Sequence, residues 1–64
     1  MHLIINGRSQ ELAAVRTLQD VIETCKVANA IALLNDQVIP VSQWANTFLK
    51  DGDALELVAI VGGG

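Results

Sequence analysis

The chain is poor in the residue types that build internal chemical sites. Its 64 residues include one cysteine, one histidine, one tryptophan and one phenylalanine, and no tyrosine. A single cysteine excludes an internal disulfide and a cysteine-based zinc site, and it fits a reducing compartment. A chain this short buries only about 60% of the surface that its unfolded form exposes, so its apolar side chains are needed for the core. We therefore expect the function on the surface or at a chain end, not in an interior cleft.

Long apolar runs and clustered positive charge are also missing. The longest apolar runs, Ala30 to Leu34 and Leu57 to Val61, have five residues each, whereas a helix that crosses a bilayer needs about 20. The start of the chain has neither the basic region nor the apolar stretch of a secretory signal. Four scattered basic residues and a net charge of -3 do not suit a phosphate backbone. We expect a cytoplasmic protein with no membrane or nucleic-acid partner.

The first part of the chain predicts a hairpin. His2 to Asn6 has the composition of a strand, and Asn6-Gly7 is a strong turn signal because both residues tolerate positive φ. We predict that the second strand follows near Glu11 to Val15. Arg8 to Gln10 then either extend the turn or begin the return strand.

A helix is predicted next, from Leu18 to Lys26 or slightly beyond. Thr17 is placed to act as its N-cap and to accept a hydrogen bond from the amide of Asp20. One apolar face follows at the spacing i, i+3, i+4, i+7, formed by Leu18, Val21, Ile22 and Cys25. This spacing predicts that Cys25 is a small core residue and not a nucleophile.

The second half of the chain alternates short strands with turns. A buried strand is predicted from Ile31 to Asn35, followed by a turn at Asn35-Asp36 and a strand from Gln37 to Ile39 that Pro40 ends. After these come a compact helical segment from Ser42 to Leu49, a turn at Asp51-Gly52-Asp53 and a last strand from Ala54 to Ile60. Hairpin, helix, two short strands and a final strand predict an α+β layout in ββαββ order, with one main helix packed on a mixed sheet. The β-grasp (ubiquitin-like) fold uses this order. We assign residues 1–60 to this domain and residues 61–64 to a flexible C-terminal glycine tail.

Several residues invite a chemical role but have a simpler interpretation. His2 stands alone near the chain start and is expected to be a solvated strand residue. Asp51, Asp53 and Glu56 suggest a metal site, but Asp-Gly-Asp favours a turn whose carboxylates bind backbone amides. Trp44 is expected to close the edge of the core rather than to stack on a ligand. We predict no catalytic and no metal-binding residue.

The tail Gly62-Gly63-Gly64 is the exception, because no hairpin, cap or core requires three glycines at a chain end. It is either a frayed terminus, a remnant of an expression tag, or a functional end. The terminal carboxylate has a reference pKa of about 3.5, so at neutral pH it is ionised and can attack an electrophile such as the α-phosphorus of ATP. Glycines can thread a narrow channel, and the four residues from Val61 reach about 13 Å.

Strand alternation adds a candidate docking patch. If Leu55, Leu57 and Ala59 face the core, then Val58 and Ile60 face outward just before the tail, and the same logic places Ile4 outward in the first strand. Should the first and last strands be neighbours, Ile4, Val58 and Ile60 form an exposed apolar patch beside the tail. The alternative is that loops or a second copy cover these residues.

The whole chain resembles a known family, the ThiS sulfur carriers of thiamine biosynthesis. The motifs that carry the resemblance are Asn35 to Pro40 followed by Trp44, then Asp51-Gly52-Asp53, an aliphatic strand and the terminal glycines. The resemblance implies a β-grasp fold and a carrier that binds no cofactor and catalyses nothing. It further implies that an E1-like enzyme of the ThiF type uses ATP and Mg to adenylate the Gly64 carboxylate. A sulfur donor protein then forms a thiocarboxylate, and the sulfur passes to a thiazole synthase of the ThiG type, with Gly62 and Gly63 inserted in the partner active sites.

The sequence departs from the family pattern at two positions. Three alternative functions also remain open. Val41 follows Pro40 where a basic residue is common, and Gly62 precedes the usual terminal diglycine. The molybdopterin-synthase small subunit shares the carrier chemistry, but it commonly has a proline pair where this chain has Val58 to Val61. A ubiquitin-like protein modifier would end in an amide with lysine. The last alternative is an inert interaction module with an accidental glycine end.

Overall fold

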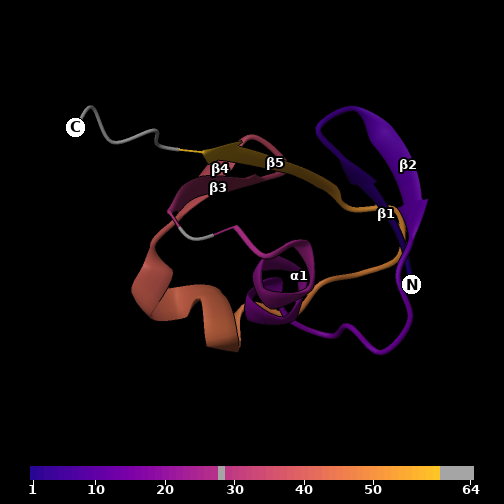
Figure 1. The fold of residues 1–64 in the computed structure, drawn as a ribbon, viewed down its shortest axis with the longest axis horizontal. Helices are drawn as coiled ribbons and strands as arrows, with labels where there is room; N and C mark the ends of the chain where they lie inside the picture. The colour runs from indigo at the N-terminus through magenta and orange to yellow at the C-terminus, as the bar shows by residue number, and fades with distance from the viewer. Residues whose placement is uncertain (28, 60–64) are drawn as a thin grey trace.

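Among the residues that the structure describes, five strands form one sheet and one α-helix crosses a face of it (Figure 1). The computed structural model describes residues 1–27 and 29–59. Its elements are β1 (His2–Ile5), β2 (Arg8–Glu11), α1 (Leu18–Cys25), β3 (Ala30–Leu34), β4 (Gln37–Ile39), a 3-10 helix η1 (Val41–Asn46) and β5 (Ala54–Ala59). The strand order is β2-β1-β5-β3-β4. β1 and β5 run parallel and the other neighbours run antiparallel, so the mixed sheet with one main helix is confirmed. The element order is ββαβββ, which contains the predicted ββαββ and adds β5 after η1.

Both hairpins in the described part of the chain turn at the residue pairs that the sequence predicts, and each turn has only two residues. Asn6 and Gly7 have φ values of 51° and 79°, and Asn35 and Asp36 have φ values of 49° and 69°. Two consecutive positive φ angles match the turn to the right-handed twist of the flanking strands. Because the first turn uses only two residues, Ile5 pairs directly with Arg8. The second strand therefore begins at Arg8 and ends at Glu11, and the prediction of a strand near Glu11 to Val15 was wrong.

The start of α1 is capped as predicted. Thr17 Oγ1 accepts a hydrogen bond from the Asp20 amide at 3.2 Å, and the Asp20 carboxylate accepts from the amides of Arg16 and Thr17 at 2.9 and 3.0 Å. This reciprocal arrangement is a capping box. The helix ends at Cys25, because Lys26 adopts the left-handed conformation with a φ of 55°. No helix within the described ranges is long and apolar enough to cross a membrane.

The helix face is buried except at its C-terminal end. Leu18, Val21 and Ile22 are buried as predicted, but Cys25 is exposed, so its assignment to the core was wrong. Cys25 is the last helical residue, and the chain turns away at Lys26 before another turn can carry that face over the sheet. Periodicity predicts which face a residue occupies, but it does not show where the packed surface ends.

In residues 1–27 and 29–59, eleven buried apolar side chains form the core between the sheet, α1 and η1: Leu3, Ile5, Val15, Leu18, Val21, Ile22, Ala30, Ala32, Trp44, Leu49 and Leu55. Trp44 closes one edge, and its Nε1 donates to the carbonyl oxygen of Ile39 at 2.9 Å, which confirms its structural role. The helical segment predicted at Ser42 to Leu49 is the 3-10 helix Val41–Asn46. Phe48 lies beyond it with 69% of its surface exposed.

The capping carboxylate gives the helix start a predicted acid sensitivity. Hydrogen bonds from the amides of Arg16 and Thr17 lower the pKa of Asp20 below its ordinary value of 3.8. A carboxyl whose pKa is lowered on folding adds stability above its unfolded pKa, and that stability is lost as pH falls through the folded pKa. We expect Asp20→Asn to melt below the unchanged protein at pH 6, and the gap between them to shrink below pH 3.8. Thermal melts by circular dichroism from pH 6 to pH 2 measure this, and a gap that stays constant would contradict it.

Candidate functional site

The sheet face opposite α1 carries several apolar side chains. Leu3, Ile5 and Leu55 are buried, so strand alternation places their neighbours on the outer face. The outer residues include Ile4 (37% exposed), Ile31 (42%), Val58 (47%) and Val38 (63%). Exposed apolar groups gathered on one face of a small domain indicate an interaction surface.

The strand register shows which of these side chains are neighbours. Val58 of β5 pairs with Ile31 of β3, and Leu33 of β3 pairs with Val38 of β4. Leu33 is half-buried. Side chains paired across neighbouring strands lie about 5 Å apart. We call this set the outer apolar patch: Ile31, Leu33, Val38 and Val58.

Two of the three residues predicted for docking can be located. Ile4 and Val58 both lie on the outer face, and the condition that the first and last strands are neighbours is met, because β1 pairs with β5. Ile4 pairs with Ala54, four residues or about 13 Å along β5 from Val58. Ile60 and the tail residues Gly62, Gly63 and Gly64 lie outside the described residues.

Sequence reasoning missed Ile31, Leu33 and Val38. Alternation alone places Ile31 and Leu33 on the face opposite the buried Ala30 and Ala32. It does not show that β3 is the antiparallel neighbour of β5, which is the fact that brings Ile31 beside Val58. A signal was present in the run Ala30 to Leu34, which is apolar at outward positions as well as inward ones.

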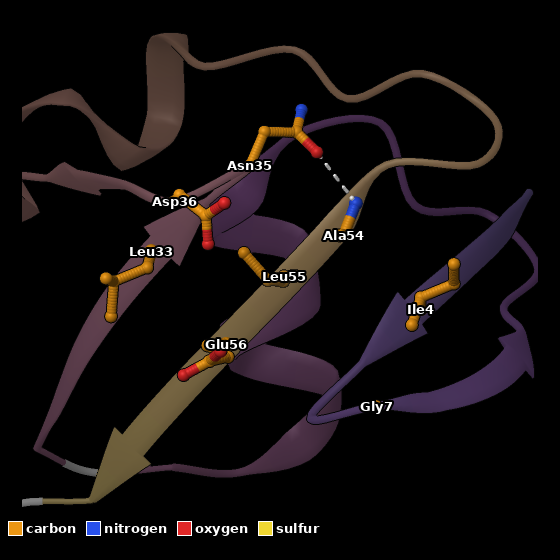
Figure 2. Close-up of a pocket in the computed structure, with 8 residues that line it drawn as sticks. All are labelled: Ile4, Gly7, Leu33, Asn35, Asp36, Ala54, Leu55 and Glu56. Carbon is orange, nitrogen blue, oxygen red and sulfur yellow. Dashed lines mark hydrogen bonds between the residues drawn. The ribbon is translucent and has the colours of Figure 1, made fainter.

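A hollow of about 290 Å³ opens on the same face (Figure 2). It is lined by Ile4, Gly7, Leu33, Asn35, Asp36, Ala54, Leu55 and Glu56. The backbone explains its position, because Ala54 pairs with Ile4 on one side and its carbonyl accepts from the Asn35 amide on the other at 2.8 Å. A small side chain between two larger ones leaves a depression in the sheet surface.

The polar side chains around the hollow differ in whether they make hydrogen bonds within the protein. The side chain of Asn35 accepts from the amide of Ala54 at 3.1 Å (Figure 2). It also donates to the carboxylate of Asp53 at 3.2 Å. The Asn35 side chain therefore holds in place the side of the hollow that Asn35 and Ala54 form. Within the described part of the chain, no hydrogen bond or ion pair engages the carboxylates of Asp36 and Glu56, and both residues are exposed.

Strand β5 is held in place up to the residues that precede the tail. The amide of Asn6 donates to the carbonyl of Leu55 at 2.9 Å, and Asn6 Oδ1 accepts from the amide of Leu57 at 2.9 Å. This side chain replaces a backbone partner at the point where β1 has ended. The direction of β5 is therefore fixed on both of its edges as far as Leu57, since β3 pairs along the other edge.

The acids of the predicted turn act on the backbone, as expected. Asp51 Oδ1 accepts from the amide of His2 at 2.6 Å, and Asp53 Oδ2 accepts from the amide of Lys50 at 2.8 Å. Across residues 1–27 and 29–59, no three His, Cys, Asp or Glu side chains are grouped to hold a metal ion. His2 contacts Ser9 Oγ through Nε2 at 2.6 Å and Glu11 through Nδ1 at 3.6 Å, at the exposed start of β1 beside β2.

Comparison with known proteins identifies the fold and the family. A model of the ThiS family matches residues 3–64. The sulfur carrier protein ThiS of Escherichia coli (strain K12) is 30% identical over 66 residues, which cover all of both chains. A thiazole synthase of Paramagnetospirillum magneticum is 33% identical over 66 residues, and this chain spans only 20% of that protein.

Solved structures agree with this result. The crystal structure of the thiamine biosynthesis protein ThiS from Geobacter metallireducens is 29% identical and matches with a TM-score of 0.83 over all of both chains. Its NMR solution structure gives the same score and identity, with 88% of that chain covered. The predicted β-grasp fold is confirmed. Because the family model matches nearly the entire chain and a full-length relative is 30% identical to it, the chain belongs to the ThiS family.

Proposed function

We propose that this chain is a sulfur carrier for the thiazole part of thiamine and that Gly64 is the residue that carries the sulfur. The observation that supports this most directly is the extent of the family match, which continues through Gly64. The chain is a small carrier and not an enzyme, and partner enzymes act on it. Its relation to the E. coli sulfur carrier protein, which is similar over its whole length, favours this function over an inert module.

The chemistry needs only the terminal carboxylate and a slender approach to it. An oxygen of the Gly64 carboxylate attacks the α-phosphorus of ATP held with Mg by the E1-like enzyme, and pyrophosphate leaves. Sulfur from a donor protein, at the oxidation state of sulfide, then displaces AMP from the acyl-adenylate and leaves a thiocarboxylate. Gly62 and Gly63 have no Cβ atoms, so they can lead the carboxylate through a narrow entrance.

The acceptor that we propose is a thiazole synthase of the ThiG type. In the P. magneticum thiazole synthase, one fifth of the protein is similar to this entire chain. A carrier-like segment and a thiazole synthase thus occur in one polypeptide in that organism. This favours thiazole synthase as the partner here over molybdopterin synthase or a lysine side chain.

Partner enzymes bind the globular part of the chain. The outer apolar patch, together with Ile4 and Ile60, is our candidate docking surface, because it lies on the face of β5 and β5 leads into the tail. From Val61 the tail can reach about 13 Å, so a partner bound to this face can receive Gly64 in an active site. We expect this exchange in the cytoplasm, since a reducing compartment suits a chain with one unpaired cysteine.

Intact-mass spectrometry tests the proposal. Incubation with the E1-like adenylating enzyme, MgATP and a sulfur donor is expected to raise the mass of the chain by the difference between sulfur and oxygen. The loaded chain is then expected to lose that sulfur to thiazole synthase. An unchanged mass with an enzyme shown to be active on another carrier would contradict the proposal, and covalent attachment to lysine would place the chain among protein modifiers.

A further inference from the structure

The hollow on the outer face has the size for one side chain. Its volume of about 290 Å³ is at the lower end of the range for ligand pockets, which is about 300–1,000 Å³. Its walls combine apolar groups, chiefly Ile4 and Leu33, with the carboxylates of Asp36 and Glu56. Figure 2 shows both carboxylates on the β3 side of β5 and Ile4 on the β1 side.

Acidic side chains outnumber basic ones on this face, although Glu11 at its β2 edge is paired with the N-terminal ammonium at 3.1 Å and lies 3.6 Å from His2. The outward strand positions in the described part of the chain include Glu11 and Glu56, and Asp36 follows in the adjacent turn, but none of the outward positions is lysine or arginine. Arg8 pairs with the buried Ile5 and so belongs to the α1 side of the sheet. The remaining basic residues lie outside the strands: Arg16, Lys26 and Lys50.

We propose that the hollow receives an arginine side chain of the adenylating enzyme, an inference that rests on the proposed function. The aliphatic stem of arginine can lie along Ile4 and Leu33, as long basic side chains commonly do on apolar surfaces. Its planar guanidinium offers five donors to the unpaired carboxylates of Asp36 and Glu56. The adenylating enzyme is the partner we name because it is the first to bind the unmodified tail.

This contact would act as a second point of attachment, distant from the tail. Ala54 in the hollow and Ala59 at the end of β5 are five residues apart, which is about 17 Å along the strand. The outer apolar patch begins beside the hollow, at Leu33, and continues along this stretch to Ile31 and Val58. A partner that holds the hollow and the patch together fixes the direction of β5 and therefore the direction from which Gly64 enters its active site.

Three variants of the carrier test the inference by their affinity for the adenylating enzyme. Glu56→Gln and Asp36→Asn each remove one charge, and asparagine suits the left-handed conformation of position 36. Ala54→Val fills the hollow without changing the charge, and valine is favoured in strands. We expect each variant to raise the Kd about tenfold, as loss of an interfacial charge contact or of its pocket would.

Glu23→Gln is the matched control, since it removes the same charge from the exposed side of α1. Its Kd and the salt dependence of its binding should equal those of the unchanged chain, whereas the salt dependence should weaken for both Glu56→Gln and Asp36→Asn. Equal affinity for all variants, or equal weakening by Glu23→Gln and Glu56→Gln, would overturn the arginine site while leaving sulfur loading intact. Failure of the unchanged chain to load sulfur would instead overturn the proposed function. Thermal melts confirm that each variant is folded.

Discussion

Conversion of the Gly64 carboxylate to a carboxamide is expected to abolish sulfur loading completely. The amide has nearly the same shape, but it lacks the negative charge and the nucleophilic oxygen that must attack the α-phosphorus of ATP. The free carboxylate has a reference pKa of about 3.5 and is fully ionised at neutral pH. Stability should not change, because the core residues lie between Leu3 and Leu55. Chemical synthesis of a chain this short makes the variant accessible, and intact mass after incubation measures the result.

Side-chain variants separate the chemistry of the tail from its shape. Gly64→Val keeps the carboxylate but adds a branched Cβ, and we expect loading to fall about 100-fold, as small misplacements of reacting atoms do. Gly62→Ala should have a smaller effect, because this residue precedes the terminal diglycine and is two residues from the reacting carboxylate. Deletion of one glycine is less informative, since the shortened chain still ends in two glycines.

Cys25 provides the control for the site of loading. It is an exposed free thiol, so it is an alternative place for sulfur. A persulfide there would add a whole sulfur atom, whereas a thiocarboxylate exchanges an oxygen for a sulfur. We expect Cys25→Ser to load normally. A carboxamide protein that still gains sulfur would show that Gly64 is not the loading point.

The parts of the fold that could be predicted from sequence are those set by local chemistry. Asn6-Gly7 and Asn35-Asp36 form the turns because these residue types accept a positive φ more readily than most others. Thr17 caps α1 because its hydroxyl accepts a hydrogen bond from the amide of Asp20. Trp44 was assigned correctly because a large side chain with one polar atom suits a core edge. In each case, neighbouring residues decide the structure.

The errors and omissions concern where packing begins and ends, which depends on distant parts of the chain. Cys25 has the correct period for the core face but lies at the end of the helix. The outer apolar patch depends on the pairing of Ile31 with Val58, residues from strands separated by β4 and η1. The hollow at Ala54 depends on Ile4 and Asn35 arriving on opposite sides of one small side chain. No local pattern contains this information.

The second large effect is expected at Val58, the member of the outer apolar patch that lies in β5. Val58→Asp places a carboxylate where a partner should exclude water, and burial of an unpaired charge is costly. We expect the Kd for the adenylating enzyme to rise about 100-fold, the size of an interface hot spot. The free energy of unfolding should fall by only about 1 kcal/mol, because Val58 is 47% exposed and a cross-strand pair contributes less than that. Isothermal titration and thermal melts measure the two effects.

Val41→Asp is the control that makes this result specific to the face. Val41 lies in η1, away from the sheet, with 65% of its surface exposed, and the substitution changes the net charge by the same amount. Its affinity should match that of the unchanged chain. If both variants weaken binding equally, overall charge and not the outer apolar patch controls association. If Val58→Asp instead unfolds the chain while Val41→Asp does not, Val58 is a core residue of the sheet, and the docking surface must lie on another part of the molecule.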